Sequence, residues 1–236
     1  MHEIFGESEE QTRISQIYKG VLKNRQPRTF ETTLILNGQK GSFEINAYPS
    51  TRGVSVVAKD VTERKRSEII MQKRFELMEY SARHTLEELM QRTVDEVSEL
   101  TGSTIGFFHF VQEDQNSLGM QTWSTNALKL FSVPIREGSH LPLDQAGMWA
   151  EAVLQRRPLI QNDYEALIHK KGLPQGQVPI TREIVIPIIR NERVMAIMGL
   201  GNKPQEYTSY DLEVAERLAD YAWDITERKQ MQVALE

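Results

Sequence analysis

Apolar residues recur with two different periods along the first segment of the chain. Over residues 9–24 they return every three or four positions, which predicts an amphipathic helix. Three short runs rich in β-branched or alternating apolar residues follow, and they predict strands at residues 29–36, 41–48 and 54–58. Asn37-Gly38 separates the first two runs and favours a type I′ turn, because both positions need positive φ. We therefore expect a helix followed by a three-stranded antiparallel meander.

The next segment, residues 62–84, is a polar helix whose few apolar residues are spaced by four, three and four positions. This spacing is typical of a coiled-coil seam. The stripe then shifts by one position, and Thr85 with Glu88 fits a capping box at a new helix start. We therefore expect the helix to break at residues 81–84. The coiled-coil stripe of residues 62–84 consists of Met71, Phe75, Met78 and Ala82.

Helical and strand patterns alternate along residues 85–222. A helix ending at Gly102 precedes two strands, an irregular stretch, a short helix that Asp144 can cap, another strand and a long loop. Two further strands pair across residues 190–193, and Pro187 in the first of them predicts a sheet edge or a bulge. The last helix begins at Thr208. This order predicts one α+β domain. A second four-three-four stripe on the last helix consists of Val214, Leu218, Tyr221 and Ile225.

Composition narrows the classes of function. The chain has 236 residues, of which 39% are hydrophobic and 26% charged, as in soluble globular proteins. Its formal net charge is -5, so broad electrostatic binding of nucleic acid or of an acidic membrane is not expected. Cysteine is absent, which excludes disulfides, thiolate zinc sites, cysteine nucleophiles and any cofactor held by a thioether bond. Neither a targeting segment nor a run of ~20 apolar residues is visible, so we expect a cytoplasmic segment without membrane contact.

Signatures of catalysis and of metal binding are sparse. The chain lacks the Gly-x-Ser-x-Gly turn of serine hydrolases and the Gly-Gly-Asp/Glu-Glu-Phe signature of cyclases. His84 lacks the acidic neighbour of a phosphoaccepting histidine, and no ATP-binding segment follows it. The 5 histidines show no tight metal-ligand spacing, so no metal site is predicted. A hydrolase would require a buried Asp next to a His. We therefore expect this segment not to be an enzyme.

Five stretches of the third segment resemble a bacterial GAF subfamily found in sensor histidine kinases and diguanylate cyclases. They lie at residues 105–111, 121–125, 142–147, 160–164 and 199–204, the last of them Gly-Leu-Gly-Asn-Lys-Pro. The order of elements is also similar to that of a GAF domain, an antiparallel sheet flanked by helices. The resemblance covers about residues 85–223. It implies a domain that binds a small ligand or relays a conformational signal to an output domain in the same protein.

Residues 1–64 resemble the C-terminal half of a PAS domain, which ends in the same helix, meander and Asp-Val-Thr-Glu-Arg motif. The motif returns as Asp-Ile-Thr-Glu-Arg at residues 224–228. Asp60 can cap the outgoing helix, Glu63 can complete a capping box, and Arg64 can pair with Asp60. An ordinary cap with solvated charges is the alternative, but the resemblance favours a relay of strand movement into helix movement. The expected relay residues are Asp60, Thr62, Glu63, Arg64, Asp224, Thr226 and Arg228.

The candidate ligand pocket is defined by aromatic and polar residues around the loops of the GAF-like segment. Tryptophans can supply aromatic walls, although core packing is their commoner role. Polar residues flank the long loop, where GAF domains that bind small ligands place contacts, although Arg182 and Glu183 can instead form a salt bridge at a strand edge. The candidates are Trp123, His140, Trp149, Asn162, Asp163, Tyr164, Arg182 and Glu183.

The expected organisation has four parts. Residues 1–61 form a partial PAS domain, residues 62–84 a helical linker, residues 85–223 a GAF domain and residues 224–236 an exit helix toward an output domain beyond the chain. The two stripes predict a parallel homodimer in which like helices pair.

The expected function is that of a non-catalytic sensory segment of a two-component protein such as a sensor histidine kinase. An alternative is a redox or gas sensor that binds haem non-covalently through His109 or His140. A hydrogen-bonded core histidine explains His109 as well.

Overall fold

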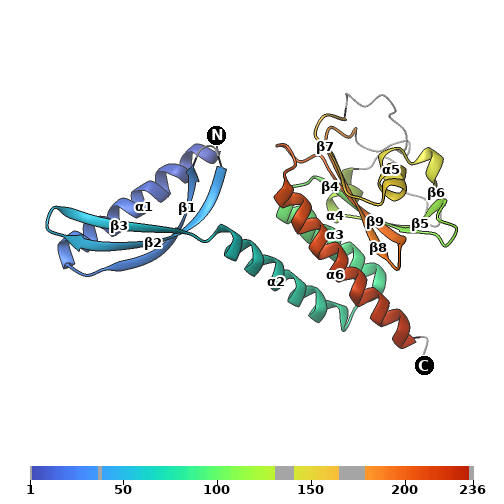
Figure 1. The fold of residues 1–236 in the computed structure, drawn as a ribbon, viewed down its shortest axis with the longest axis horizontal. Coiled ribbons are helices and arrows are strands. Elements are labelled where there is room, and N and C mark those ends of the chain that lie inside the picture. The colour runs from blue at the N-terminus through green and yellow to red at the C-terminus, as the bar shows by residue number, and fades with distance from the viewer. Residues whose placement is uncertain (1, 37–38, 131–140, 165–178, 234–236) are drawn as a thin grey trace. The chain divides into compact units, whose positions relative to one another are not determined.

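The computed structural model describes residues 2–36, 39–130, 141–164 and 179–233 (Figure 1). The chain divides into two compact units, Met1–Ile69 and Ile70–Glu236. Each unit contains one antiparallel sheet. In the described part of the chain, no helix is long and apolar enough to cross a membrane.

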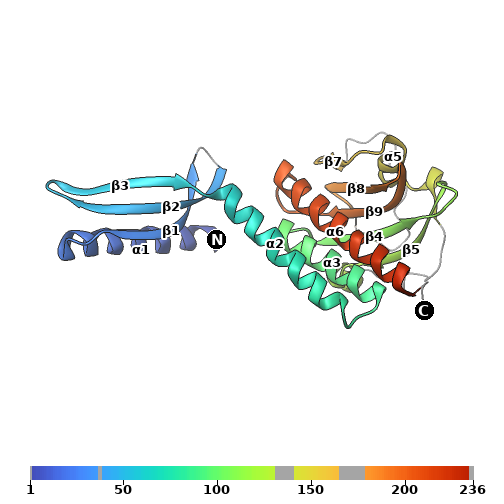
Figure 2. The same cartoon turned by 60° about the horizontal axis from the view of Figure 1, so that its bottom comes forward.

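The first unit is a three-stranded antiparallel sheet with a helix on one face (Figure 2). Ile45 and Ala47, two positions apart on one strand, are buried, as is Val21 of the helix. The predicted helix and meander are confirmed, and Leu36 pairs with Gln39, although the two turn residues between them lie outside the described residues. The elements are α1 (His2–Asn24), β1 (Arg28–Leu36), β2 (Gln39–Ser50) and β3 (Gly53–Asp60), in sheet order β1-β2-β3.

The second unit is a six-stranded antiparallel sheet between helices, with strand order β6-β5-β4-β9-β8-β7. The helices α3 and α6 lie side by side on one face, and α5 lies on the other (Figures 1 and 2). The predicted α+β class is confirmed. The elements are α3 (Leu86–Thr101), β4 (Ile105–Val111), β5 (Ser117–Trp123), α4 (Thr125–Leu130), β6 (Leu141–Pro142), a 3-10 turn (Leu143–Gln145), α5 (Met148–Gln155), β7 (Leu159–Gln161), β8 (Glu183–Arg190), β9 (Arg193–Gly201) and α6 (Ser209–Val233).

Alternation along the central strands divides the core of the second unit in two. Phe108 and Met198 belong to the core that contains residues of α3 and α6. Phe107 and Ile197, one position earlier on the same two strands, belong to the core that contains residues of α5. Because successive side chains of a strand point to opposite faces, an offset of one position decides which core a residue joins. The core on the α5 side carries the candidate ligand residues.

The stripe predicted on α6 packs inside the second unit. Val214 and Leu218 are fully buried, Ile225 is 7% exposed, and Tyr221 packs against the same core. These side chains are therefore not free to form a seam with a second copy. The prediction of a dimer seam on this helix is wrong, because a helix lying on a sheet needs the same apolar stripe as a coiled coil.

The stripe predicted on α2 (Thr62–Ser81) is exposed. The helix buries Leu77 instead, and the side chains of Met71, Phe75 and Met78 are 73%, 53% and 50% exposed. The predicted break after this helix is confirmed, since α2 ends at Ser81 and α3 starts with a capping box between Thr85 and Glu88. The seam on α2 stays a prediction.

Polar contacts hold the second half of α2 against α3 and α6. Nζ of Lys73 lies 2.7 Å from Oε2 of the buried Glu96 on α3. The guanidinium carbon of Arg74 lies 4.3 Å from the ring centroid of Tyr221 on α6, a cation–π geometry. Movement of α6 can therefore reach α2 through side chains already in contact.

Two features near the sheet edges differ from the predictions. Asp144 lies in the 3-10 turn and does not cap α5, whose N-cap is Gly147 at φ 54° without a side-chain hydrogen bond. The six-residue α4 is not predicted at all. Its start is fixed from α3, where Asp95 accepts hydrogen bonds from N and Oγ1 of Thr125 at 2.6 and 2.7 Å. A helix this short depends on such tertiary contacts.

Pro187 lies in β8, at a position where the sheet does not need the backbone N–H that proline lacks. β7 pairs with only the first three residues of β8, so no described strand pairs with Pro187 on that side, and the register shifts between Ile188 and Ile189. The prediction of an edge or a bulge is confirmed.

Candidate ligand site on the six-stranded sheet

The buried carboxyl group of Glu183 lies at the centre of the candidate site. Glu183 begins β8, and its side chain is almost completely enclosed at 1% exposure. Its Oε1 accepts a hydrogen bond of 2.7 Å from Nε1 of Trp149 on α5. Its Oε2 is buried, and no group among the described residues forms a hydrogen bond with it.

Burial dominates the electrostatics of this carboxyl group. It raises the pKa of Glu183 to about 7, while the hydrogen bond from Trp149 acts in the opposite direction. Burial and the charge of Glu183 together raise the pKa of the buried Tyr164 to about 12. Among the residues that the structure describes, no cation contributes to the pKa shift of Glu183. A shifted carboxyl group without a cationic partner is more typical of a functional site than of a structural ion pair.

Aromatic rings pack beside Trp149 on the same face of the sheet. The centroid of the Trp149 ring lies 4.4 Å from that of Phe107 and 5.0 Å from that of His109. The Phe107 centroid is also 5.4 Å from that of Trp123. Gly199 makes this packing possible, because a Cβ added there would lie 1.9 Å from Cζ of Phe107. The site therefore combines one carboxyl group with an aromatic wall.

His109 is part of the aromatic wall and is neutral. Burial lowers its pKa to about 3. Its Nε2 is buried and has no hydrogen-bond partner in the part of the chain that the structure describes. The ring packs edge-on against Phe107 at 5.3 Å and Trp123 at 6.1 Å between centroids. An uncharged imidazole with a free nitrogen can bind a hydrogen-bond partner or a metal centre.

Two of the predicted pocket residues instead connect neighbouring loops. Oδ1 of Asn162 accepts a hydrogen bond of 2.7 Å from N of Tyr207, and its Nδ2 donates one of 3.1 Å to O of the same residue. Nη1 of Arg182 donates to the carbonyl oxygens of Lys203 and Pro204 at 3.4 and 3.3 Å. Both residues thus join the segment around the site to the chain that leads into α6. Arg182 does not form the expected salt bridge with Glu183, and its Nε is buried without a hydrogen-bond partner among the described residues.

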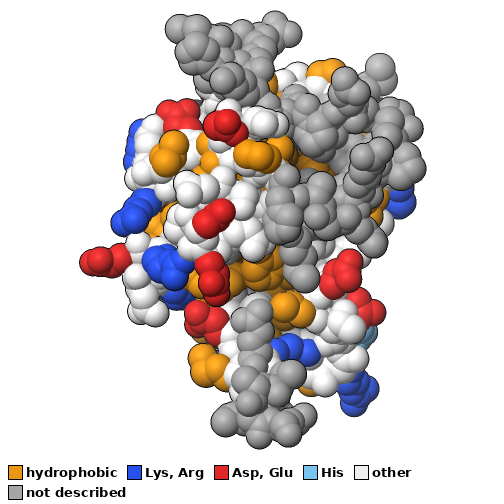
Figure 3. Space-filling view, turned by 90° about the vertical axis from the view of Figure 1, so that its right-hand side faces the viewer, with side chains coloured by type: hydrophobic (Ala, Val, Ile, Leu, Met, Phe, Trp, Pro, Cys, Tyr) orange, Lys and Arg blue, Asp and Glu red, His pale blue; other side chains and the backbone are white. Residues whose placement is uncertain are grey.

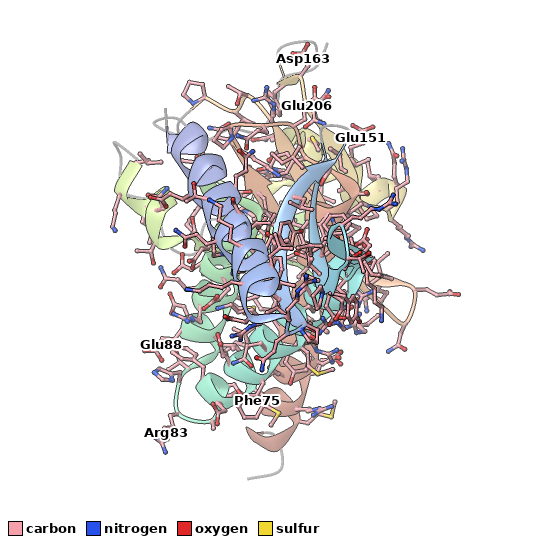
Figure 4. All side chains as sticks on the ribbon, turned by 90° about the vertical axis from the view of Figure 1, so that its left-hand side faces the viewer. Phe75, Arg83, Glu88, Glu151, Asp163 and Glu206 are labelled. Carbon is pink, nitrogen blue, oxygen red and sulfur yellow. The ribbon has the colours of Figure 1, made fainter. Side chains whose placement is uncertain are left out.

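The structure does not place the other two predicted pocket residues, Asp163 and His140, at the carboxyl group. Asp163 is exposed and lies with Glu206 at one end of the second unit, opposite the end that carries Phe75, Arg83 and Glu88 (Figure 4). His140 lies outside the described residues. The structure therefore brings together Trp123, Trp149, Tyr164 and Glu183 from the predicted set. It adds Phe107, His109 and Gly199, for which alternation along β4 and β9 is the signal in the sequence.

Charged contacts fix both ends of α6. Near its start, Nζ of Lys203 lies 2.7 Å from each carboxylate oxygen of Asp211, which also accepts from N of Thr208 at 2.7 Å. Near its end, Nζ of Lys229 donates a hydrogen bond of 2.5 Å to the backbone oxygen of His84, in the turn between α2 and α3. The helix therefore connects the loop that Asn162 holds to the turn at the end of α2.

The first relay motif joins β3 to α2. Oδ1 of Asp60 accepts a hydrogen bond of 2.8 Å from N of Thr62, whose Oγ1 accepts one of 2.9 Å from N of Ser42 on β2. The hydrogen bonds to Thr62 lower the pKa of Asp60. The start of α2 is therefore held to two strands of the first unit.

The charged residues of this motif form other pairs than those expected. Arg64 donates to Glu31 on β1 at 2.9 Å and to Glu68 at 2.7 Å, and not to Asp60. Glu63 accepts from Arg66 at 2.8 Å instead of completing a capping box. The expected pairs within the motif are wrong, because partners from a neighbouring strand and the next helical turn lie closer.

The second copy of the motif lies within α6 (Ser209–Val233), so Asp224 caps no helix. Asp224 accepts a hydrogen bond of 2.9 Å from Arg190 at the end of β8. Thr226 is fully buried and donates from Oγ1 to O of Ala222 at 2.8 Å, and Arg228 is exposed. This copy therefore attaches α6 to the end of β8.

A hollow of about 470 Å³ lies in the first unit. Its charged lining groups bind one another. Arg13 binds Glu10 through Nε at 2.8 Å, and Nζ of Lys65 lies 2.5 Å from Oε2 of Glu31. In the same described ranges, no three His, Asp or Glu side chains are grouped to hold a metal ion.

Comparison with curated proteins finds a longer relative. The chain is 31% identical over 226 residues to a methyl sulfide methyltransferase-associated sensor of Methanosarcina acetivorans, with 91% of this chain covered. It spans only 22% of the length of that relative.

Solved structures show the same fold at low sequence identity. The GAF domain of a phosphoenolpyruvate-protein phosphotransferase from Coxiella burnetii superposes with a TM-score of 0.54 at 11% identity, over 70% of this chain and 96% of that one. A free methionine-R-sulfoxide reductase from Neisseria meningitidis superposes with a TM-score of 0.50 at 15% identity, over 70% and 91%. The family model of the GAF domain matches residues 83–227, more than half of the sequence. The chain belongs to the GAF domain family.

Proposed function

We propose that this chain is the sensory segment of a signal-transduction protein and that its GAF domain binds a small ligand at Glu183 and Trp149. The observation that carries the proposal is the buried carboxyl group with one unbound oxygen beside an aromatic wall. In either protonation state that oxygen lacks a partner, which costs about 1–3 kcal/mol. A ligand that supplies the missing hydrogen bond recovers this free energy. The relative described as a sensor supports a sensory role.

We propose that α6 carries the signal away from the site. The helix has 25 residues and is roughly 37 Å long. Asn162 binds Tyr207 just before its first turn, and Lys229 binds His84 near its other end. A ligand that shifts the segment 162–164 would displace the start of α6, and a rigid helix passes this displacement on to the turn after α2. A sensor histidine kinase is the output that we expect.

The first unit, which resembles the C-terminal half of a PAS domain, passes a signal to α2 in this proposal. Its motif at Asp60 and Thr62 binds the start of α2 to β2. Movement of the meander would therefore turn or shift α2 directly.

The ligand-binding role is tested by a thermal-shift screen of the full chain against cyclic nucleotides, aromatic acids, amino acids and haemin. We expect at least one class to raise the melting temperature of wild type and of Glu151→Gln, and to have no effect on Glu183→Gln. Glu151 is a matched control because it is an exposed glutamate on the same helix as Trp149. A shift for no class, or an equal shift in Glu183→Gln, would overturn the assignment of this site.

The exposed stripe on α2 predicts a homodimer. Burying the side chains of Met71, Phe75 and Met78 against a second copy would remove large apolar surfaces from water. We expect light scattering to give twice the chain mass for wild type and the single mass for Phe75→Glu. Leu154→Glu, at a side chain that is 74% exposed on α5, is the matched control and is expected to stay dimeric. Monomeric wild type at the highest soluble concentration would contradict the dimer.

A haem-based redox or gas sensor is the second candidate, favoured by the neutral His109 and its unbound Nε2. A neutral imidazole is the form that ligates iron. The chain would hold haem only non-covalently, because it has no cysteine. Haemin should then give a Soret band in wild type that changes in His109→Ala. An unchanged band in that variant removes this candidate.

A further inference from the structure

The charge of the ligand can be inferred from the groups that enclose Glu183. Among the described residues, the hydrogen-bond partner of its side chain is the indole N–H of Trp149. The charge of Glu183 also helps to raise the pKa values of two buried phenols, Tyr164 and Tyr207. Among the described residues, neither a lysine nor an arginine contributes to the pKa shift of Glu183. The ionised carboxyl group therefore has no described cation to balance it, and it would repel an additional anion.

Arg182 is the cation next in sequence. Its Nη1 donates to the carbonyl oxygens of Lys203 and Pro204 at 3.4 and 3.3 Å, and its Nε is buried without a hydrogen-bond partner among the described residues. It does not contribute to the pKa shift of Glu183.

The aromatic wall also favours a positively charged ligand. Ring faces carry the negative part of the quadrupole, so they attract cations and repel anions. Trp149 binds Glu183 through its N–H and packs against Phe107 with a 4.4 Å centroid distance. On the described part of the face shown in Figure 3, acidic and basic side chains are interspersed.

We propose that the ligand of this site carries an ammonium or amidinium group, whose N–H donor binds Oε2 of Glu183 beside the ring of Trp149. This inference rests on the proposed ligand-binding function and names the chemical class of the ligand. The donor satisfies the oxygen that has no partner, and the positive charge neutralises the buried carboxylate. A hydrogen bond between ionised groups is shorter and stronger than one between neutral groups. A quaternary ammonium ion does not meet the requirement, because it has no N–H donor.

The test uses three probes that share one ring and differ in charge: benzamidinium, benzamide and benzoate. Their binding to the full chain is measured by calorimetry at mildly alkaline pH. We expect benzamidinium to bind tightest, and Glu183→Gln to weaken it by roughly tenfold or more, since hydrogen bonds to charged groups contribute about 1.5–3 kcal/mol. Glu151→Gln is the matched control and should leave its affinity unchanged.

A second variant guards against a loss of folding in Glu183→Gln. Trp149→Phe keeps an aromatic ring and the carboxyl group, so it should still prefer benzamidinium to benzoate. Benzoate or benzamide binding as tightly as benzamidinium, with the same dependence on Glu183, would overturn the cationic class and leave the ligand-binding function standing. Binding of benzamidinium that is equal in wild type and Glu183→Gln would overturn the proposal, as would no binding of any probe. In the latter case the wider ligand screen decides separately whether the site binds a ligand.

Discussion

Glu183→Gln and His109→Gln are expected to change the pH dependence of stability in opposite directions. Burial raises the pKa of Glu183 to about 7 in the folded chain from its ordinary value of 4.5, so the folded state binds one more proton than the unfolded state between these two pH values. Burial lowers the pKa of His109 to about 3 from its ordinary value of 6.5, so between these two pH values the unfolded state binds one more proton. Between pH 4.5 and 6.5 the two contributions cancel in wild type.

Each substitution removes one side of this balance. Glu183→Gln leaves His109, so the free energy of unfolding should rise with pH by about 1.4 kcal/mol per unit relative to wild type. His109→Gln leaves Glu183, so the free energy of unfolding should fall with pH by a similar amount relative to wild type. Urea unfolding across this range, followed by tryptophan fluorescence, reports on the second unit alone, because all 3 tryptophans lie in it. Parallel pH profiles for the two variants would show that these groups are not buried as described.

Gly199→Ala is expected to destabilise the second unit by about 3 kcal/mol. The new Cβ would lie 1.9 Å from Cζ of Phe107, and the ring cannot move aside because Trp149 and Trp123 pack against it. Gly201→Ala is the matched control on the same strand. Its nearest contact is Cδ1 of Ile180 at 3.3 Å, the flexible end of a side chain, so it should cost much less.

A double-mutant cycle separates the clash from other effects of the substitution. Phe107→Leu shortens the side chain, so Gly199→Ala should cost at least about 1.5 kcal/mol less in that background than in wild type. Urea unfolding of the four chains gives the coupling energy. Additive costs would mean that Phe107 does not lie over Gly199.

The local elements of the fold follow from short-range chemistry, and the sequence predicts them well. Alternation and turn residues predict the meander, and the structure confirms it at residues 28–60. The pair Thr85 and Glu88 predicts the start of α3, where the structure shows the capping box. The α6 stripe is misassigned, because the same spacing serves a helix on a sheet and a coiled coil. The short α4 depends on Asp95, thirty residues earlier, which no local pattern reveals.

The sequence predicts only part of the candidate site, because local patterns do not reveal partners that lie far apart in the chain. Trp149 and Glu183 stand out in the sequence as an aromatic and a polar residue near loops, and the structure joins them by a hydrogen bond. Phe107 does not stand out, because an apolar residue in a strand is ordinary until its neighbours are known. Arg64 likewise binds Glu31, 33 residues away, in place of the partner within its own motif. Chemistry-bearing residues are visible in the sequence, but their partners are set by the tertiary fold.

The central claim is that a ligand at Glu183 changes α6, and one NMR titration tests it most directly. The indole N–H signals separate the two locations, because Trp149 lies at the site and Trp223 lies on α6 in the opposite core. Single Trp→Phe variants assign the signals. A ligand found in the screen is predicted to move the signals of Trp149 and Trp223 over the same concentration range, and Asn162→Ala to leave only the shift of Trp149. A Trp149 signal that no ligand moves, or one that moves while Trp223 stays fixed in wild type, would contradict the account.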